Sequence, residues 1–142
     1  MVVSRRDLER TLEFIRSVEQ AKSADAICAG LLKTVSQFGM WHILAGTIPT
    51  PGSTRAQQEA HVLLHEWPVE WWERYFSNGY LFVDPAIRHV VSDASPFLWS
   101  DLDPMCRDDP AATRVMREAS EFRLKNGFTV SLMRLDGTIA GF

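Results

Sequence analysis

Cysteine is scarce in this sequence, which has only Cys28 and Cys106 among its 142 residues. Two cysteines cannot build the disulfide framework of a small secreted domain, so we expect a reducing, cytoplasmic location. Long apolar runs are missing as well. No run approaches the roughly 18–20 residues that a membrane span requires, and the N-terminus lacks the charged-then-apolar pattern of a signal peptide. We therefore expect no membrane partner.

Positive charge is too sparse to form a surface for nucleic acid. The chain has 15 Lys and Arg against 18 Asp and Glu, which gives a formal net charge of -3 and a pI near 5.8. Nucleic-acid-binding domains usually carry a clustered basic face that neutralises phosphates. This chain by itself is therefore not expected to bind DNA.

Side chains that could form a metal centre or a catalytic set are also few. His61 and His65 have the four-residue spacing of a metal pair, but no third ligand lies nearby in the sequence. Their order, His-x-x-x-His-Glu, also differs from the metalloprotease motif, in which Glu follows the first His. Asp84 has no candidate histidine near it, and no nucleophile, base and acid set is evident. We expect no metal, no cofactor and no enzyme activity.

What is present suits one globular domain over residues 1–142. Hydrophobic residues make up 46% of the chain and charged residues 23%, which is enough for a single core. Apolar periodicity, cap residues and turn signals predict the elements. Helices are expected at 5–18, 24–38, 68–77, 85–92 and 110–123, strands at 41–46, 61–65, 97–99, 128–133 and 138–142, and loops at 49–53 and 101–110.

This order of elements indicates an α+β domain with an antiparallel sheet. Asp136-Gly137 is a strong hairpin signal between the last two strands. The returning strand at 138–142 is expected to be truncated relative to its partner, which would leave Ile139 and Phe142 at an unpaired edge.

The stretch from Trp67 to Trp99 holds four of the five tryptophans, both tyrosines and the Asp84-Pro85 step. Aromatic side chains enclose small apolar ligands well, and a lone acid such as Asp84 can face the pocket that they form. Asp-Pro is also an ordinary helix start, with Asp as the N-cap and Pro at the first helical position. From the spacing alone, a buried core with a capped helix is the commoner meaning of such a cluster, and both interpretations stay open.

The spacing Trp67-Pro68-x-x-Trp71-x-x-x-Tyr75, then Tyr80, Asp84-Pro85 and Pro96-x-x-Trp99, resembles the autoinducer-binding domain of LuxR-type quorum-sensing regulators. The resemblance extends over about residues 60–142. The second half of that domain is matched by Glu118-Ala119, Phe122, Leu124, Gly127, Thr129 and Asp136-Gly137. The resemblance implies an α/β/α sandwich with a five-stranded antiparallel sheet. It also implies a ligand cavity between the sheet and one helical layer.

The resemblance further implies an N-acyl-homoserine lactone as the ligand. Trp71 matches the family's tryptophan whose indole N–H donates to the lactone carbonyl, and Asp84 matches the aspartate that accepts from the ligand's amide N–H. Trp99 matches the aromatic residue that packs over the lactone ring, and Tyr75 matches one that lines the pocket beside it. Trp67 stands where many members have a tyrosine whose hydroxyl meets the acyl carbonyl.

Three departures from the family pattern bear on these expectations. Trp67 is bulkier than tyrosine and donates from a different position, so head-group geometry or tail size is expected to differ. Arg123 replaces the usual glycine of a Phe-Gly-Leu motif, which is expected to destabilise the chain if the site needs a left-handed backbone. The sequence also ends at Phe142, before the family's acyl-carbonyl Ser or Thr and before its helix-turn-helix.

Three hypotheses for the function follow. The first is the sensor domain of a LuxR-family transcription regulator, C-terminally incomplete, with an autoinducer as its small-molecule partner and DNA reached only through a missing domain. The second is an interaction protein that dimerises with a full-length regulator and inhibits it. The third, the least favoured, is an enzyme acting on a small amide or lactone. Under the first two hypotheses we expect a homodimer or a heterodimer.

Overall fold

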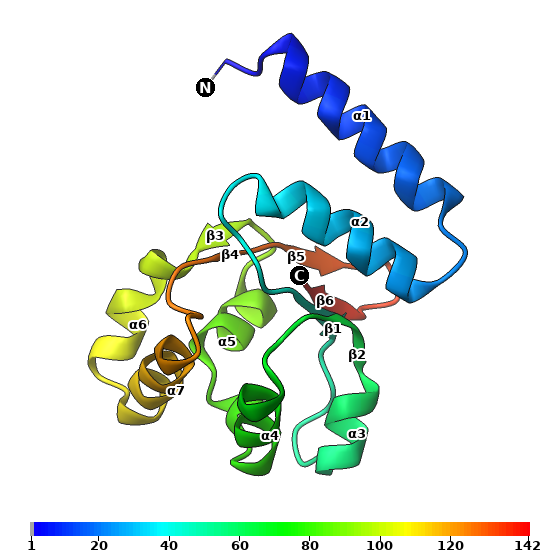
Figure 1. Cartoon of the computed structure of the whole chain (residues 1–142). Helices are drawn as coiled ribbons and strands as arrows, with labels where there is room; N and C mark the ends of the chain where they lie inside the picture. The colour runs from blue at the N-terminus through cyan, green and yellow to red at the C-terminus, as the bar shows by residue number, and fades with distance from the viewer. Residues whose placement is uncertain (1) are drawn as a thin grey trace.

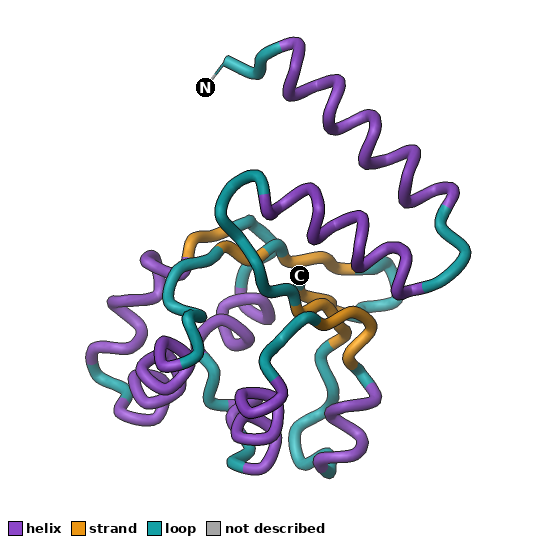
Figure 2. Tube along the Cα trace, in the orientation of Figure 1, coloured by secondary structure: helices purple, strands orange, loops and turns teal. Residues whose placement is uncertain are grey.

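The structure, a computed structural model, describes residues 2–142. An antiparallel sheet lies between two sets of helices (Figures 1 and 2). The helices are α1 (Arg5–Gln20), α2 (Ala24–Ser36), α3 (Arg55–Ala60), α4 (Val69–Ser77), α5 (Pro85–Ser92), α6 (Asp103–Arg107) and α7 (Pro110–Glu121), with 3₁₀ turns η1 (Tyr80–Phe82) and η2 (Trp99–Leu102). The strands are β1 (Leu44–Thr47), β2 (Val62–His65), β3 (Phe97–Leu98), β4 (Phe128–Thr129), β5 (Ser131–Met133) and β6 (Ile139–Gly141). In Figure 1, α1 and α2 lie on one side of the sheet and α3 to α7 on the other.

The expected antiparallel sheet is confirmed, as a four-stranded sheet in the order β2-β1-β6-β5 and a two-stranded ladder of β3 and β4. Val130 alone separates β4 from β5, and it exchanges backbone hydrogen bonds of 2.7 and 2.9 Å with Phe142. The segment 128–133 therefore belongs to both ladders and makes the pairing continuous from β2 to β3. The predicted unpaired edge is wrong, because β6 lies between β1 and β5 and is paired on both sides.

Local sequence signals explain where the helices begin. Ser4 and Ser23 accept hydrogen bonds from backbone N–H groups in the first turns of α1 and α2, and Asp84 and Asp109 do the same for α5 and α7. These four predicted starts are confirmed. The sequence pattern missed α3, although a capping box marks its start: Thr54 and the residue three positions later bond each other's backbone N–H.

The predicted loop at 101–110 is wrong for most of its length, because η2 and α6 occupy residues 99–107. The physical reason is burial of one side chain. Leu102 is 1% exposed and packs in a core cluster with Val90 and Phe97, which draws its polar neighbours into helical turns. Polar composition alone indicates a loop, and a single buried leucine overrides that indication.

The core below the sheet is an aromatic cluster centred on α4 and η1. Trp71, Tyr75, Phe76 and Tyr80 are each at most 5% exposed, and Val115 of α7 packs against them. On the neighbouring helix α5, Val90 faces β6. A Cβ placed on Gly141 would lie 3.4 Å from a methyl group of Val90, so helix and strand are in close contact. This packing fixes α4 and α5 beneath the centre of the sheet.

The end of α7 has a left-handed backbone at Arg123, with φ of 64°. The N–H of Leu124 bonds the carbonyl of Ala119, and the N–H of Arg123 bonds the carbonyl of Ser120. This pair of bonds is the Schellman motif, in which glycine usually holds the position that Arg123 occupies. The condition attached to the Arg123 prediction is therefore met: this turn does require a left-handed backbone.

Helix α1 has an apolar stripe that the structure leaves uncovered. The stripe predicted from the sequence is present, but Leu8, Leu12 and Ile15 are 44–54% exposed and no residue of α1 is buried. α1 packs on α2 and extends away from the remainder of the domain (Figure 1). Among residues 2–142, no helix is both long enough and apolar enough to cross a membrane.

Candidate functional site

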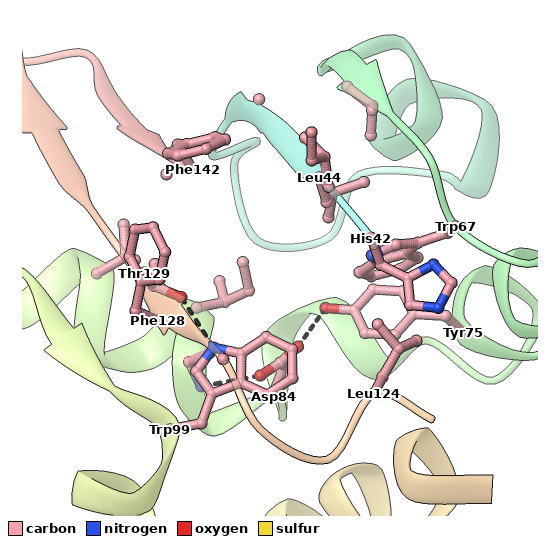
Figure 3. A pocket seen from close by; sticks show the side chains of 18 of the residues that line it. His42, Leu44, Trp67, Tyr75, Asp84, Trp99, Leu124, Phe128, Thr129 and Phe142 are labelled. Carbon is pink, nitrogen blue, oxygen red and sulfur yellow. Dashed lines mark hydrogen bonds between the residues drawn. The ribbon is translucent and has the colours of Figure 1, made fainter. Parts of the chain in front are cut away.

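A cavity of about 580 Å³ lies between the sheet and the layer that contains α4 and α5. Sheet residues such as Leu44, Gly46 and Phe142 form one wall, and Tyr75 and Asp84 belong to the opposite one. Gly46 brings two strands close together here, since a Cβ on it would lie 2.5 Å from the carbonyl oxygen of His61. Figure 3 shows the side chains that face this space.

Asp84 is the acid of this cavity, and it is held by two hydrogen bonds. The Tyr75 hydroxyl donates to Asp84 Oδ2 over 2.7 Å, and the Ala86 backbone N–H donates to Oδ1 over 2.8 Å (Figure 3). The two interpretations of Asp84 that the sequence left open are therefore compatible. Oδ1 caps α5, while the carboxylate also lines the cavity.

Burial governs the electrostatics of this pair. Loss of hydration raises the pKa of Asp84, and the hydrogen bonds from Tyr75 and Ala86 oppose that rise. Burial, together with the charge of Asp84, raises the pKa of Tyr75 well above its ordinary value. Tyr75 is therefore a protonated donor at neutral pH. Each carboxylate oxygen has two lone pairs, so Asp84 retains acceptor capacity toward the cavity.

Trp99 forms a flat wall beside Asp84. Its indole N–H donates to Thr129 Oγ1 over 3.0 Å, which fixes the ring across the β3–β4 ladder (Figure 3). Gly127 lies directly beneath the ring, because a Cβ there would sit 2.9 Å from Trp99 Cε2. Gly127 thus leaves the space that the indole fills.

The structure separates the other two predicted tryptophans. Trp67 lines the cavity and packs edge-on against Tyr75, with ring centroids 5.1 Å apart. Trp71 is 2% exposed and lies behind this wall, in contact with Trp67, Tyr75, Tyr80 and Phe122. Of the five predicted site residues, Trp67, Tyr75, Asp84 and Trp99 therefore line the cavity, and Trp71 supports two of them from behind.

Sequence reasoning did not single out two polar residues of the cavity, His42 and Gln58. His42 Nδ1 lies 3.0 Å from the carbonyl oxygen of Glu66. A carbonyl only accepts, so Nδ1 carries the proton and Nε2 is the acceptor of the neutral ring. Gln58 is 7% exposed and lies in α3. The capping box that opens α3 was the signal that could have placed Gln58 on a helix.

The arrangement is that of a binding site with apolar walls and a few polar groups. Apolar surface excludes water, while Asp84 offers an acceptor to a donor on the ligand. Within residues 2–142, no group of three or more His, Cys, Asp and Glu side chains could hold a metal ion. The geometry suits a small, mostly apolar molecule that carries at least one N–H or O–H donor.

Comparisons with known proteins agree with this geometry. A family profile described as "Autoinducer binding domain" matches residues 23–142. The chain is 36% identical over 132 residues to RpaR of Rhodopseudomonas palustris, an HTH-type quorum sensing-dependent transcriptional regulator, with 92% of this chain and 52% of RpaR covered. It is 30% identical over 126 residues to BjaR1 of Bradyrhizobium diazoefficiens, a transcriptional activator protein, with 89% of this chain and 51% of BjaR1 covered. The chain thus spans about half the length of these curated relatives.

A solved structure shows the same fold. CepR2 of Burkholderia cenocepacia, described as an N-acylhomoserine lactone dependent LuxR family transcription factor, superposes with a TM-score of 0.74 at 22% sequence identity. The superposition covers 97% of this chain and 76% of that one.

Proposed function

Because the chain belongs to the autoinducer-binding domain family of LuxR-type transcriptional regulators, we propose that it senses an N-acyl-homoserine lactone in the cavity beside Asp84. The observation that carries this proposal is the cavity-lining carboxylate of Asp84, hydrogen-bonded to Tyr75 and set next to the flat indole of Trp99.

The chemistry of the ligand matches these groups. An acyl-homoserine lactone buries one amide N–H and two carbonyl oxygens, and each costs about 1–3 kcal/mol if it is left unpaired. Asp84 accepts from the amide N–H, and Trp99 packs against the lactone ring. The acyl carbonyl accepts from a donor of the opposite wall, where Trp67 and Tyr75 lie.

Trp71 keeps its proposed role only if its indole N–H becomes exposed to the ligand. In the structure its ring packs in the aromatic cluster behind Trp67 and Tyr75. We propose that Trp71 first acts by holding these two residues in place. Donation to the lactone carbonyl then requires a small rotation of Trp71 when the ligand enters.

Within a complete regulator, the proposed role of this domain is to couple ligand binding to transcription. The chain spans about half of RpaR and BjaR1, so control of DNA binding and pairing with a second copy are proposals for the whole protein. The binding step proposed here involves no bond breaking and no catalytic residue.

The test replaces Asp84 by alanine and uses Asp109→Ala as its matched control. Both aspartates cap a helix by accepting from backbone N–H groups two or three residues ahead, but only Asp84 lines the cavity. Loss of either cap is expected to cost about 1 kcal/mol of stability. The Tyr75 hydroxyl additionally loses its partner in Asp84→Ala.

The readout is the thermal shift produced by octanoyl-homoserine lactone. At a hundred times the Kd, binding stabilises a protein by about 2.7 kcal/mol. We expect this shift in wild type and in Asp109→Ala, and a much smaller one in Asp84→Ala. The matching octanoyl ester, which has no amide N–H, should bind weakly to all three proteins. Equal shifts in Asp84→Ala and wild type would reduce Asp84 to a helix cap, and Asp84→Asn replaces the alanine variant if that variant does not fold.

A further inference from the structure

Gln58 is a buried polar residue whose amide oxygen has no protein partner. Its side chain is 7% exposed and lines the main cavity. Over residues 2–142, the buried side-chain nitrogen and oxygen atoms without a hydrogen bond are Gln58 Oε1 and Ser53 Oγ. An orphaned acceptor of this kind costs about 1–3 kcal/mol, so its presence in a cavity wall calls for a ligand-based explanation.

The orientation of the Gln58 amide follows from its neighbour. Nε2 lies 2.9 Å from the backbone carbonyl oxygen of Ser53, and a carbonyl can only accept. The nitrogen must therefore be the atom that faces Ser53, which leaves Oε1 as the free atom. A flipped amide would set two acceptors against each other. The free group is thus an acceptor that can bind only a donor.

Gln58 lies at the opposite end of the sheet from the proposed lactone site. It sits in α3, which packs on β2, whereas Trp99 and Thr129 belong to the β3–β4 end. The strand order puts three strand spacings between β4 and β2, or roughly 14 Å at about 4.8 Å each. With its lactone beside Trp99, an acyl chain running along the sheet ends near α3.

We propose that Gln58 is a specificity-determining residue that accepts a hydrogen bond from a hydroxyl group at the distal end of the ligand's acyl chain. The inference rests on the proposed function and narrows its ligand class to acyl-homoserine lactones with a terminal hydroxyl. An unsubstituted chain leaves Oε1 without a partner in the complex. A hydroxylated chain supplies the O–H donor there and loses no hydrogen bond to water in doing so.

The experiment compares matched ligand pairs on wild type, Gln58→Met and Gln58→Glu by titration calorimetry. Each pair is a hexanoyl-, octanoyl- or decanoyl-homoserine lactone with and without a hydroxyl on the last carbon. Methionine keeps the length of the side chain and removes the acceptor, while glutamate keeps an acceptor. Gln20→Met at the exposed end of α1 is the control for the chemical change.

We expect wild type and Gln20→Met to prefer the hydroxylated member of at least one pair by about tenfold, the factor that one ordinary hydrogen bond supplies. The preference should fall to about onefold in Gln58→Met and persist in Gln58→Glu. Because each ratio is taken within one protein, any general weakening by the lost bond to Ser53 cancels.

Equal binding of both members by wild type overturns the inference and leaves the proposed function standing. Such a result would mean that Oε1 is satisfied by water. A hydroxyl preference that survives in Gln58→Met also overturns the inference, because the donor then binds elsewhere. Failure of every lactone to bind wild type overturns the proposed function and this inference with it. If Gln58→Met does not fold, the wild-type ratio still decides.

Discussion

Replacement of Arg123 by glycine is expected to stabilise this chain. Arg123 holds the left-handed position of the Schellman motif at the end of α7, with φ of 64°, and it is an exposed side chain. A residue with a Cβ pays about 1–2 kcal/mol for this conformation, whereas glycine adopts it freely. Glycine also makes the unfolded chain more flexible, which returns about 0.5–1 kcal/mol of that gain.

The expected net gain is therefore about 0.5–1 kcal/mol, which corresponds to a rise in Tm of about 2–4 °C for a domain of this size. Thermal and urea unfolding of wild type, Arg123→Gly and Arg123→Ala measure it. Alanine keeps the Cβ and removes only the guanidinium, so its stability should stay within about 0.5 kcal/mol of wild type.

Lys125→Gly provides the matched control. Lys125 is exposed and two residues away, but its φ is not positive, so glycine there should cost about 0.5–1 kcal/mol. The argument from backbone conformation fails if Arg123→Gly is no more stable than wild type. It also fails if Arg123→Ala gains as much as Arg123→Gly, since the side chain rather than the backbone would then be the cause.

Three other predictions concern the site and the packing behind it. Ligand affinity, measured by titration calorimetry across the acidic range, should fall as pH falls through the raised pKa of Asp84, because the protonated carboxyl is a poorer acceptor for the amide N–H; constant affinity there would contradict this. Glu118→Gln should cost about 1–2 kcal/mol in urea unfolding at neutral pH, because Glu118 is 9% exposed and accepts from Arg114 over 2.8 Å. The hydrogen bond from Arg114 is first among the interactions that lower the pKa of Glu118, so the difference between the two proteins should vanish as pH falls through that lowered value. Gly127→Ala should weaken lactone binding more than it lowers Tm, because its Cβ would displace the Trp99 indole; an unchanged Kd would show that Trp99 does not pack on the ligand.

The sequence predicted the fold where a short segment carries its own signal. Ser4, Ser23, Asp84 and Asp109 are caps whose hydrogen bonds involve residues two or three positions away, so local pattern was enough. The wall made by Trp67, Tyr75, Asp84 and Trp99 needed the resemblance as well. The spacing of those residues is equally typical of an ordinary aromatic core.

Features that depend on distant contacts could not be predicted. The position of Trp71 behind the cavity wall follows from packing against Phe122 of another segment, 5.5 Å away between ring centroids. The roles of His42 and Gln58 follow from hydrogen bonds to the backbone at Glu66 and Ser53. Nothing in the sequence pattern distinguishes them from other polar residues near a strand.

The exposed position of α1 has a consequence for the order in which the domain opens. A 16-residue helix is marginal in water without tertiary support, and α1 buries no residue of its own. Its amide hydrogens should therefore exchange with solvent deuterium through local opening, while those of α4 and α7 exchange only when the core unfolds. The N-terminal helix is then a separate unit of cooperativity, whose loss leaves the ligand cavity intact.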